Sequence, residues 1–380
     1  MVKRRILTIL QVIPKLQTGG VERGAVDVAC FLKQQGHIPL VVSAGGKLLA
    51  VLRRHKIPHV TLPVDSKNPF VVAFNAFRIA RLIRKHHVNI VHARSRAPAW
   101  SAYWACQRTK CAFLTTFHGT YNFKGRLKQK YNAVMTYGKK VIAPSQFIKD
   151  HILNHYPFRD PRRILVVPRG VDAAVFNAFP LEVGRLKELF DHYRLPFDKK
   201  MILMPGRITR WKGHQVLLEA VTRLKRDDFA VVFLGATHKK NKGYYQELQT
   251  SIVDRNLGSR VFLIDETDDI AAFYKMAYGV VSASTDPEAF GRVMAEAGAV
   301  GRPIIASDHG GAREIVVPGK TGWLFPSGNS DKLAECLDKL LSLSFAAYKT
   351  MSKTATDHIQ KNFSNEQMLA KTLTVYESLV

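Results

Sequence analysis

Three things are scarce in this sequence: cysteine, long apolar runs and, in its first part, acidic side chains. No apolar run approaches the roughly 20 residues that span a bilayer, and the first residues lack the small-residue cleavage site of a secretory signal. A disulfide framework would be unusual in a chain of 380 residues. We therefore expect a cytoplasmic protein without a membrane span. The few cysteines show no metal-ligand spacing; they are Cys30, Cys106, Cys111 and Cys336.

The scarcity of acidic residues is confined to one part of the chain. Residues 1–170 hold 30 lysines and arginines against 5 aspartates and glutamates, whereas residues 171–380 hold 27 against 25. Solubility alone would not need so uneven a distribution. We therefore expect a polyanionic partner for the first part. Nucleic acid is one candidate, but no nucleic-acid-binding motif is visible, and we do not expect it to be the partner.

Short β-branched runs alternate with amphipathic segments, which is typical of parallel sheets covered by helices. After a less apolar stretch at 169–199, the pattern starts again with the run MILMPG at Met201. With 46% hydrophobic residues, the chain can fill two cores. We predict an α/β protein with two Rossmann-like lobes, residues 1–174 and 175–364, followed by a final helix at 365–380.

The stretch STDPEAFGRVMAEAGAVGRPIIASDHGG, from Ser284 to Gly311, places two carboxylates around the start of one helix. Apolar strands flank this helix, and ligands of parallel sheets bind beyond the carboxyl ends of the strands. We expect Glu288 in the loop and Glu296 about two turns inside the helix. The N–H groups of Phe290 and Gly291 are expected to open the helix unpaired, which suits an anion such as a diphosphate.

Carboxylates beside an anion site indicate a nucleotide sugar, because ribose and hexose hydroxyls donate well to carboxylate oxygens. Charge-assisted hydrogen bonds of this kind contribute about 1.5–3 kcal/mol each. The alternative is that Glu296 only pairs with Arg292, one turn earlier, and that Glu288 only occupies a polar loop. That ion pair has the less favourable order and contributes a few tenths of a kcal/mol. Small residues around Glu296 leave room for another group and favour the ligand interpretation.

The spacing of Glu288 and Glu296, with seven residues between them, resembles the E-x7-E motif of family 4 retaining glycosyltransferases. The resemblance covers essentially the whole chain. It implies a B-type glycosyltransferase fold, in which the two lobes face across a cleft and the second lobe holds the nucleotide sugar. It also implies that the final helix returns to the first lobe.

Each lobe's first strand runs into a glycine-containing loop. In the first lobe, Gly19 and Gly20 precede a helix, where a phosphate can approach the backbone. In the second, Gly206-Arg207 and Lys212-Gly213 resemble the family's Gly-Arg and Lys-Gly elements, so Arg207 and Lys212 are expected to neutralise the departing diphosphate. The acidic run at 265–269 is interpreted as a helix start, capped by Thr267 or Asp268, and not as a metal site. We predict no metal and no cofactor besides the donor.

His118 ends a strand of the first lobe, and the resemblance implies that it contacts the transferred sugar. Family enzymes retain the anomeric configuration, and front-face displacement is the mechanism that the resemblance implies. The segments VHARSRAPAW, SKNP and VPRGVD resemble the branch that adds mannose to Kdo-bearing lipid A precursors in lipopolysaccharide-core synthesis. We therefore expect GDP-mannose, or else a UDP-sugar, as donor. Arg169 departs from the asparagine usual in the wider family. The expected acceptor-binding residues are Arg94, Ser95 and Arg96.

Two segments of the first lobe offer cationic and apolar surface, the helix at 70–87 and the sequence KGRLKQK at 124–130. They are expected to meet the anionic inner face of the bacterial inner membrane, where a lipid-linked, acidic acceptor would lie. An ordinary solvated helix face is the alternative for both. A sugar-nucleotide epimerase on the same fold is an alternative for the enzyme as a whole.

Overall fold

The computed structural model describes residues 5–17, 19–121, 125–157, 159–177, 182–237, 241–265, 267 and 269–380. These residues form two compact units. Unit 1 comprises residues 1–170 together with 366–380, and unit 2 comprises residues 171–365. The division follows Gly170, four residues before the boundary that the sequence suggested.

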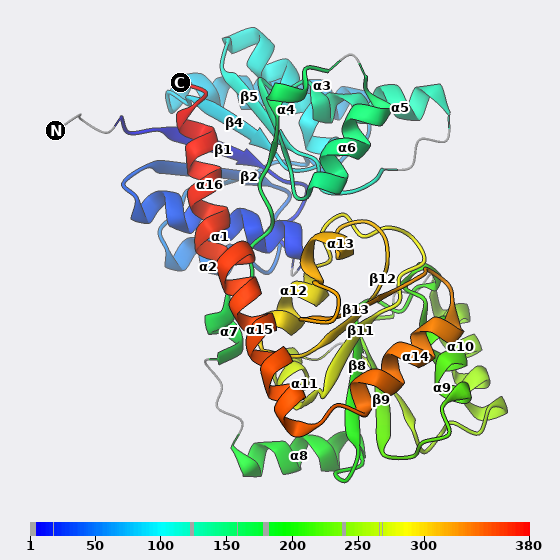
Figure 1. Ribbon diagram of the computed structural model, residues 1–380. Coiled ribbons are helices and arrows are strands. Elements are labelled where there is room, and N and C mark those ends of the chain that lie inside the picture. The colour runs from blue at the N-terminus through cyan, green and yellow to red at the C-terminus, as the bar shows by residue number, and fades with distance from the viewer. Residues whose placement is uncertain are drawn as a thin grey trace. The chain divides into compact units, whose positions relative to one another are not determined.

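Unit 1 is built on a seven-stranded parallel sheet with the order β3-β2-β1-β4-β5-β6-β7 (Figure 1). The strand order reverses between β1 and β4, where the chain crosses from one half of the sheet to the other. Its strands are β1 (Thr8–Val12), β2 (Ile38–Ser43), β3 (His59–Thr61), β4 (Ile90–Ala93), β5 (Ala112–Thr116), β6 (Lys140–Ala143) and β7 (Ile164–Val166).

Helices cover both faces of this sheet, because right-handed crossovers that run in opposite directions along a sheet lie on opposite faces. Helices α3 to α6 therefore cover one face, and α1 and α2 the other. The helices are α1 (Gly20–Gln34), α2 (Leu49–Arg54), α3 (Pro69–Lys85), α4 (Arg96–Thr109), α5 (Arg126–Ala133), α6 (Gln146–His155), the 3-10 turns η1 (Val134–Thr136) and η2 (Pro161–Arg163), and α16 (Asn365–Glu377).

Helix α16 supplies part of the unit 1 core although it follows unit 2 in the chain. Its Leu369 and Leu373 pack with Ile9 of β1 and Leu32 of α1. Tyr376 is fully buried in the same cluster. The last helix is therefore an integral part of unit 1.

Unit 2 repeats the design with a six-stranded parallel sheet of order β10-β9-β8-β11-β12-β13. Apolar clusters lie on both faces of this sheet, as strands that are buried on both sides require. The order reverses between β8 and β11. The strands are β8 (Lys200–Pro205), β9 (Phe229–Leu234), β10 (Val261–Ile264), β11 (Gly279–Ser282), β12 (Ile304–Ser307) and β13 (Gly322–Phe325).

The helices of unit 2 leave the carboxyl ends of these strands free for loops. They are α7 (Ala173–Asn177), α8 (Val183–Tyr193), the 3-10 turn η3 (Arg210–Lys212), α9 (His214–Arg223), α10 (Lys242–Asp254), α11 (Ile270–Met276), α12 (Arg292–Ala299), α13 (Ala312–Ile315), α14 (Ser330–Leu341) and α15 (Phe345–Phe363). The α/β class with two parallel sheets, predicted from the alternating pattern, is confirmed.

Candidate functional site

Glu288 lies in the loop between β11 and α12, where two side chains hold its carboxylate. Lys212 Nζ donates to Oε1 over 2.5 Å, and Ser284 Oγ donates to the same oxygen over 2.9 Å. The side chains of Lys212 and Glu288 are only 12% and 17% exposed. Lys212 ends η3, which follows β8, so the pair joins the loops of β8 and β11. These two strands flank the reversal of strand order, where open parallel sheets bind ligands.

Two glycines allow the loop that carries Glu288 to rest on the chain just before α13. The Gly311 N–H donates to the Glu288 carbonyl over 2.9 Å. A Cβ at Gly310 would come within 2.6 Å of the same carbonyl oxygen, and one at Gly311 would overlap the Phe290 carbonyl. Any side chain at either position would push the loop away. The sequence Asp-His-Gly-Gly therefore supports the position of Glu288.

The helix that follows Glu288 begins later than the sequence suggested. Helix α12 begins at Arg292, and Gly291 is its N-cap in a left-handed conformation, with φ +95°. Phe290 is only 4% exposed and packs against the ring of Phe363. The prediction that Phe290 and Gly291 open the helix was wrong by two residues. The first-turn N–H groups are those of Arg292 and Val293.

Glu296 is the fifth residue of α12, nearer the start than two turns, and protein groups contact both of its carboxylate oxygens. Arg292 Nε donates to Oε1 over 2.6 Å, and the Tyr274 hydroxyl donates to Oε2 over 2.7 Å. The glutamate is 7% exposed. Burial, followed by the Glu296 charge, raises the pKa of Tyr274 well above its usual value. The ion pair considered as the alternative is formed, and Tyr274, which sequence reasoning missed, completes it. The carboxylate is thus held in place before any ligand arrives, with lone pairs left to accept further bonds.

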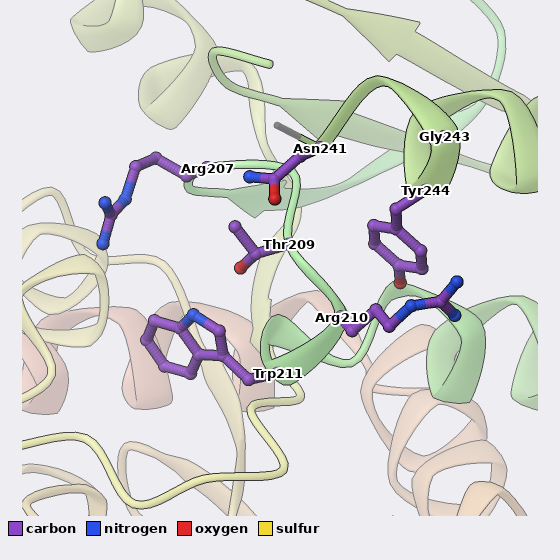
Figure 2. Close-up of a pocket in the computed structure, with 7 residues that line it drawn as sticks. All are labelled: Arg207, Thr209, Arg210, Trp211, Asn241, Gly243 and Tyr244. Carbon is purple, nitrogen blue, oxygen red and sulfur yellow. The ribbon is translucent and has the colours of Figure 1, made fainter. Parts of the chain in front are cut away.

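A pocket of about 620 Å³ opens next to Arg207 (Figure 2). The side chains of Arg210 and Tyr244 lie together on one side of the view, with the guanidinium 4.9 Å from the ring centre, and Arg207 extends away from them. Buried polar atoms of Thr209 and Asn241 have no hydrogen-bond partner within the described residues. The pocket joins the loop after β8 to the start of α10. Its lining residues are Arg207, Thr209, Arg210, Trp211, Asn241, Gly243 and Tyr244.

In unit 1, His118 follows β5 and lies among cations. Both of its ring nitrogens are buried, and neither has a hydrogen-bond partner in the part of the chain that the structure describes. Burial, then the charges of Arg169 and Arg94, lowers the pKa of His118 well below its usual value, so the ring is neutral at pH 7. Gly20 opens α1, with Gly19 as its N-cap, and the Arg169 guanidinium donates to the Gly20 carbonyl. Thr18 lies outside the described residues.

Arg94 belongs to a buried polar network of unit 1. It is 6% exposed, and its Nε donates to Gln11 Oε1 over 2.7 Å. Tyr376 hydrogen-bonds to Arg94 and, over 2.7 Å, to His92 Nδ1. His92 Nε2 lies 2.7 Å from Thr116 Oγ1. No sequence pattern indicated this network, because Tyr376 and His92 are 284 positions apart.

The other two expected acceptor residues lie at the start of α4 and are more accessible than Arg94. Ser95 is the N-cap of the helix, in an extended conformation. Arg96 is half-buried, donates to Asn132 Oδ1 over 3.0 Å and lies 4.3 Å above the ring centre of Tyr121. Both follow β4, next to the reversal of strand order in the first sheet. Their role in binding an acceptor stays a prediction.

The acidic run at 265–269 precedes α11, with Asp269 as the N-cap in place of Thr267. Thr267 Oγ1 instead accepts from the Asp269 N–H, and Asp268 and Glu266 lie outside the described residues. Within the described ranges, no group of three or more histidine, cysteine or acidic side chains is arranged to hold a metal ion. Across the same ranges, no helix has the length and apolar character needed to cross a bilayer.

Comparison with known families assigns each half of the chain. Residues 187–358 match the family model "Glycosyl transferases group 1", and residues 18–175 match "Glycosyltransferase Family 4". The first match contains Lys212, Glu288 and Glu296, and the second contains His118 and Arg94. The two matches together cover all strands of the second sheet and all strands of the first sheet except β1.

Individual proteins agree with this assignment. A glycosyltransferase from Rickettsia africae of known structure is 39% identical, covers 99% of both chains and superimposes with a TM-score of 0.91. HepE from Anabaena, solved in complex with UDP, is 20% identical, covers 98% of this chain and 100% of its own, and has a TM-score of 0.85, which shows the shared fold. The lipopolysaccharide 1,2-N-acetylglucosaminetransferase of Salmonella typhimurium is 29% identical over 210 residues, which are 53% of this chain. The chain spans about half the length of that relative.

The expectation of a glycosyltransferase with a B-type fold is confirmed, and neither an epimerase nor a nucleic-acid-binding protein is favoured. Lys212 and Glu288 lie on the loops after β8 and β11. The chain belongs to the group 1, family 4-like glycosyltransferases.

Proposed function

We propose that the protein transfers a hexose, with retention of anomeric configuration, from a nucleotide sugar to an acidic, lipid-linked acceptor. The observation that carries this proposal is the half-buried Lys212–Glu288 pair at the strand reversal of unit 2. The ammonium and the carboxylate of this pair already bind each other. On ligand binding, Lys212 would exchange its partner for a phosphate, and Glu288 would exchange its partner for a sugar hydroxyl. Both new contacts would be charge-assisted hydrogen bonds.

The donor half of the reaction would use three sets of groups in unit 2. Lys212 and Arg207 would face the diphosphate, and the first-turn N–H groups of α12 would add a fixed partial positive charge. Glu288 would then accept from the sugar, and Glu296 from the ribose. Stabilisation of the leaving diphosphate by these groups would not require a metal ion.

His118 would contact the transferred sugar from unit 1. Because its pKa is lowered, the ring is neutral at pH 7 and can donate from one nitrogen and accept at the other. Its two unpartnered nitrogens offer that capacity to a sugar hydroxyl. No side chain that is positioned as a covalent nucleophile is needed if the departing phosphate deprotonates the acceptor on the same face.

GDP-mannose is the donor that we propose, and a UDP-sugar is the second candidate. The first rests on the resemblance of the unit 1 loops to lipopolysaccharide-core mannosyltransferases. The second is favoured by the similarity to HepE, which was solved with UDP, and to an N-acetylglucosaminetransferase. Calorimetric titration with GDP, UDP and ADP separates them, because only the matching nucleotide should bind in the micromolar range.

A phosphorylated, Kdo-containing lipid A precursor is the acceptor that we propose, met at the cytoplasmic face of the inner membrane. The cationic character of unit 1 supports an acidic acceptor, and the Salmonella relative is named for lipopolysaccharide synthesis. Arg96 and Ser95 are candidates to contact its acidic groups. Arg94 would contribute from within the core by fixing the start of α4.

The test is transfer of labelled sugar from GDP-mannose and from UDP-sugars to such a precursor, with and without EDTA. We expect product from one donor and no effect of EDTA. Product released without any acceptor but with an altered sugar would support an epimerase. A strict requirement for a divalent ion would overturn the metal-independent mechanism.

A further inference from the structure

Helix α3 exposes three phenylalanines on one face. Phe70, Phe74 and Phe77 are 85%, 61% and 62% exposed. Their spacing of four and three residues puts them on the same side of the helix. The opposite side is buried and packs on the unit, with Ile79 and Ile83 among its contacts. Single exposed apolar residues are common on protein surfaces, whereas a contiguous stripe of aromatic rings indicates a binding surface.

Neighbouring helices extend this apolar stripe. Helix α4 lies between α3 and α5, because Ser101 donates to the Val72 carbonyl on one side and Trp100 to the Tyr131 carbonyl on the other. One turn beyond Trp100, Trp104 is 37% exposed. On α5, Leu127 is 85% exposed. We call the surface made by these side chains the aromatic face; its residues are Phe70, Phe74, Phe77, Trp104 and Leu127.

The charges around the aromatic face have one sign. Helices α3, α4 and α5 contain no aspartate or glutamate. Along α3, the exposed face that begins with the phenylalanines continues with Arg81 and Arg84. Apolar rings followed by cations match the layers of an anionic bilayer, where acyl chains lie beneath phosphate groups. The exposed cations of the three helices are Arg78, Arg81, Arg84, Lys85, Arg108, Arg126, Lys128 and Lys130.

The apolar end of this surface lies toward the candidate site of unit 1. A helix that follows a parallel strand begins at the carboxyl edge of the sheet, so Phe70 and Leu127, near the starts of α3 and α5, lie toward that edge. Ser95 and His118 follow strands of the same sheet and lie at the same edge. A membrane that receives the aromatic rings would therefore present its lipid head groups near the residues expected to bind the acceptor.

We propose that the aromatic face inserts into the head-group region of an anionic membrane, with the surrounding cations contacting lipid phosphates. This inference rests on the proposed transfer to a lipid-linked acceptor and identifies the surface that meets the membrane. A nucleic acid duplex would use the cations but leave the three phenylalanine rings in water. A bilayer accommodates both, so part of the binding should persist when salt screens the charges.

The test is co-sedimentation of the full chain with vesicles of phosphatidylglycerol and phosphatidylethanolamine, and with vesicles of phosphatidylcholine alone. We expect binding to the anionic vesicles that weakens but persists at 0.5 M salt. The triple substitution Phe70→Ser, Phe74→Ser and Phe77→Ser should weaken it at least tenfold and abolish the salt-resistant part. Phe345→Ser is the matched control, because Phe345 is 74% exposed but lies on α15 of unit 2. The control should bind as the wild type does.

Quenching of tryptophan fluorescence tests directly whether the aromatic face enters the membrane. Lipids brominated near the head group should quench tryptophan fluorescence on binding, and Trp104→Phe should remove most of that quenching. Wild-type affinity in the triple variant, equal binding to both vesicle types, or binding only to duplex DNA would overturn the inference. Nucleotide binding, measured by calorimetry, should be unchanged in the triple variant. A protein that binds vesicles as expected yet transfers no sugar would refute the proposed function and leave the aromatic face established.

Discussion

The two units share one architecture, but they differ in the contacts of their cationic side chains near the strand reversal. In unit 2, two cations near the strand reversal have carboxylate partners: Lys212 pairs with Glu288, and Arg292 pairs with Glu296. In unit 1, the contacts of two cations include neutral groups: Arg94 donates to the Gln11 side chain, and Arg169 to the Gly20 carbonyl. Unit 2 can therefore exchange an internal partner for a ligand without leaving a charge exposed. Residues 1–170 of unit 1 carry a large excess of cationic over acidic side chains, which an anionic partner would neutralise. Under the proposed function, the same fold would serve the donor in one case and an acidic acceptor in the other.

Replacing Lys212 tests the unit 2 half of this comparison and should have the largest effect on activity. Lys212→Ala should lower kcat/KM by about 10²–10³-fold, the loss found for one preorganised donor to a developing oxyanion. Steady-state kinetics measures this, and Arg226→Ala is the control, because that arginine pairs with Asp228 and Asp338 elsewhere in unit 2. A loss below threefold would mean that Lys212 does not face the leaving group.

Reversing the charge of α5 tests the unit 1 half. Arg126, Lys128 and Lys130 changed to glutamate should weaken binding to anionic vesicles by at least about 3 kcal/mol, at about 1 kcal/mol for each basic residue near the surface. Lys124 lies outside the described residues and is left unchanged. The same reversal of Lys349, Lys353 and Lys361 on α15 should have little effect. Equal losses in the two variants would show that only net charge matters.

Substitutions of Arg94 and Arg96 distinguish a residue of the buried network from a residue that binds the acceptor. Arg94→Met leaves Gln11 Oε1 without its donor, whereas the Tyr376 hydroxyl keeps His92 Nδ1. The substitution should lower stability by about 1–3 kcal/mol, the cost of one unpaired buried group. Arg96→Met should leave stability nearly unchanged and reduce transfer to the acceptor. Urea unfolding and kinetics with varied acceptor check both. Wild-type stability in Arg94→Met would contradict the network.

The two glutamates of unit 2 should separate binding from turnover. Glu296→Gln should weaken the donor by about 1.5 kcal/mol, the value of one charge-assisted hydrogen bond, whereas Glu288→Gln should mainly slow turnover. Calorimetry and single-turnover rates measure the two effects. Unchanged donor affinity and rate in both variants would show that neither carboxylate contacts the donor.

Buried histidines give both units a mild sensitivity to acid. Burial lowers the pKa of His118 and His92 in unit 1, and of His214 in unit 2 to about 3. Since the unfolded state binds protons near pH 6.5 and the folded state does not, stability is fully present above that pH and falls below it. Each histidine should cost about 0.7 kcal/mol between pH 7 and pH 6. Thermal melts at the two values, repeated with His118→Gln, should show a smaller drop for the variant; an equal drop would contradict the burial.

The sequence predicted what depends on local pattern and missed what depends on distant contacts. Alternating apolar runs were sufficient for the two parallel sheets, and the E-x7-E spacing for the loop and helix that carry Glu288 and Glu296. The start of α12 was misplaced, because Gly291 and the close approach of Gly310 to the Glu288 loop set it together. The burial of Arg94 could not be foreseen, since its partner Tyr376 comes from the last helix.

That last helix has a consequence for how the protein is made. Leu369, Leu373 and Tyr376 leave the ribosome only after all of unit 2, so the first unit cannot close its core while the second is being synthesised. Until then, Leu32 and its neighbours stay uncovered, and partly folded chains with exposed apolar surface are prone to aggregate. Unit 2, whose residues are consecutive, can fold first and shorten the distance that α16 must cover. A chain cut before residue 366 should therefore yield a folded second unit joined to a first unit that chaperones retain.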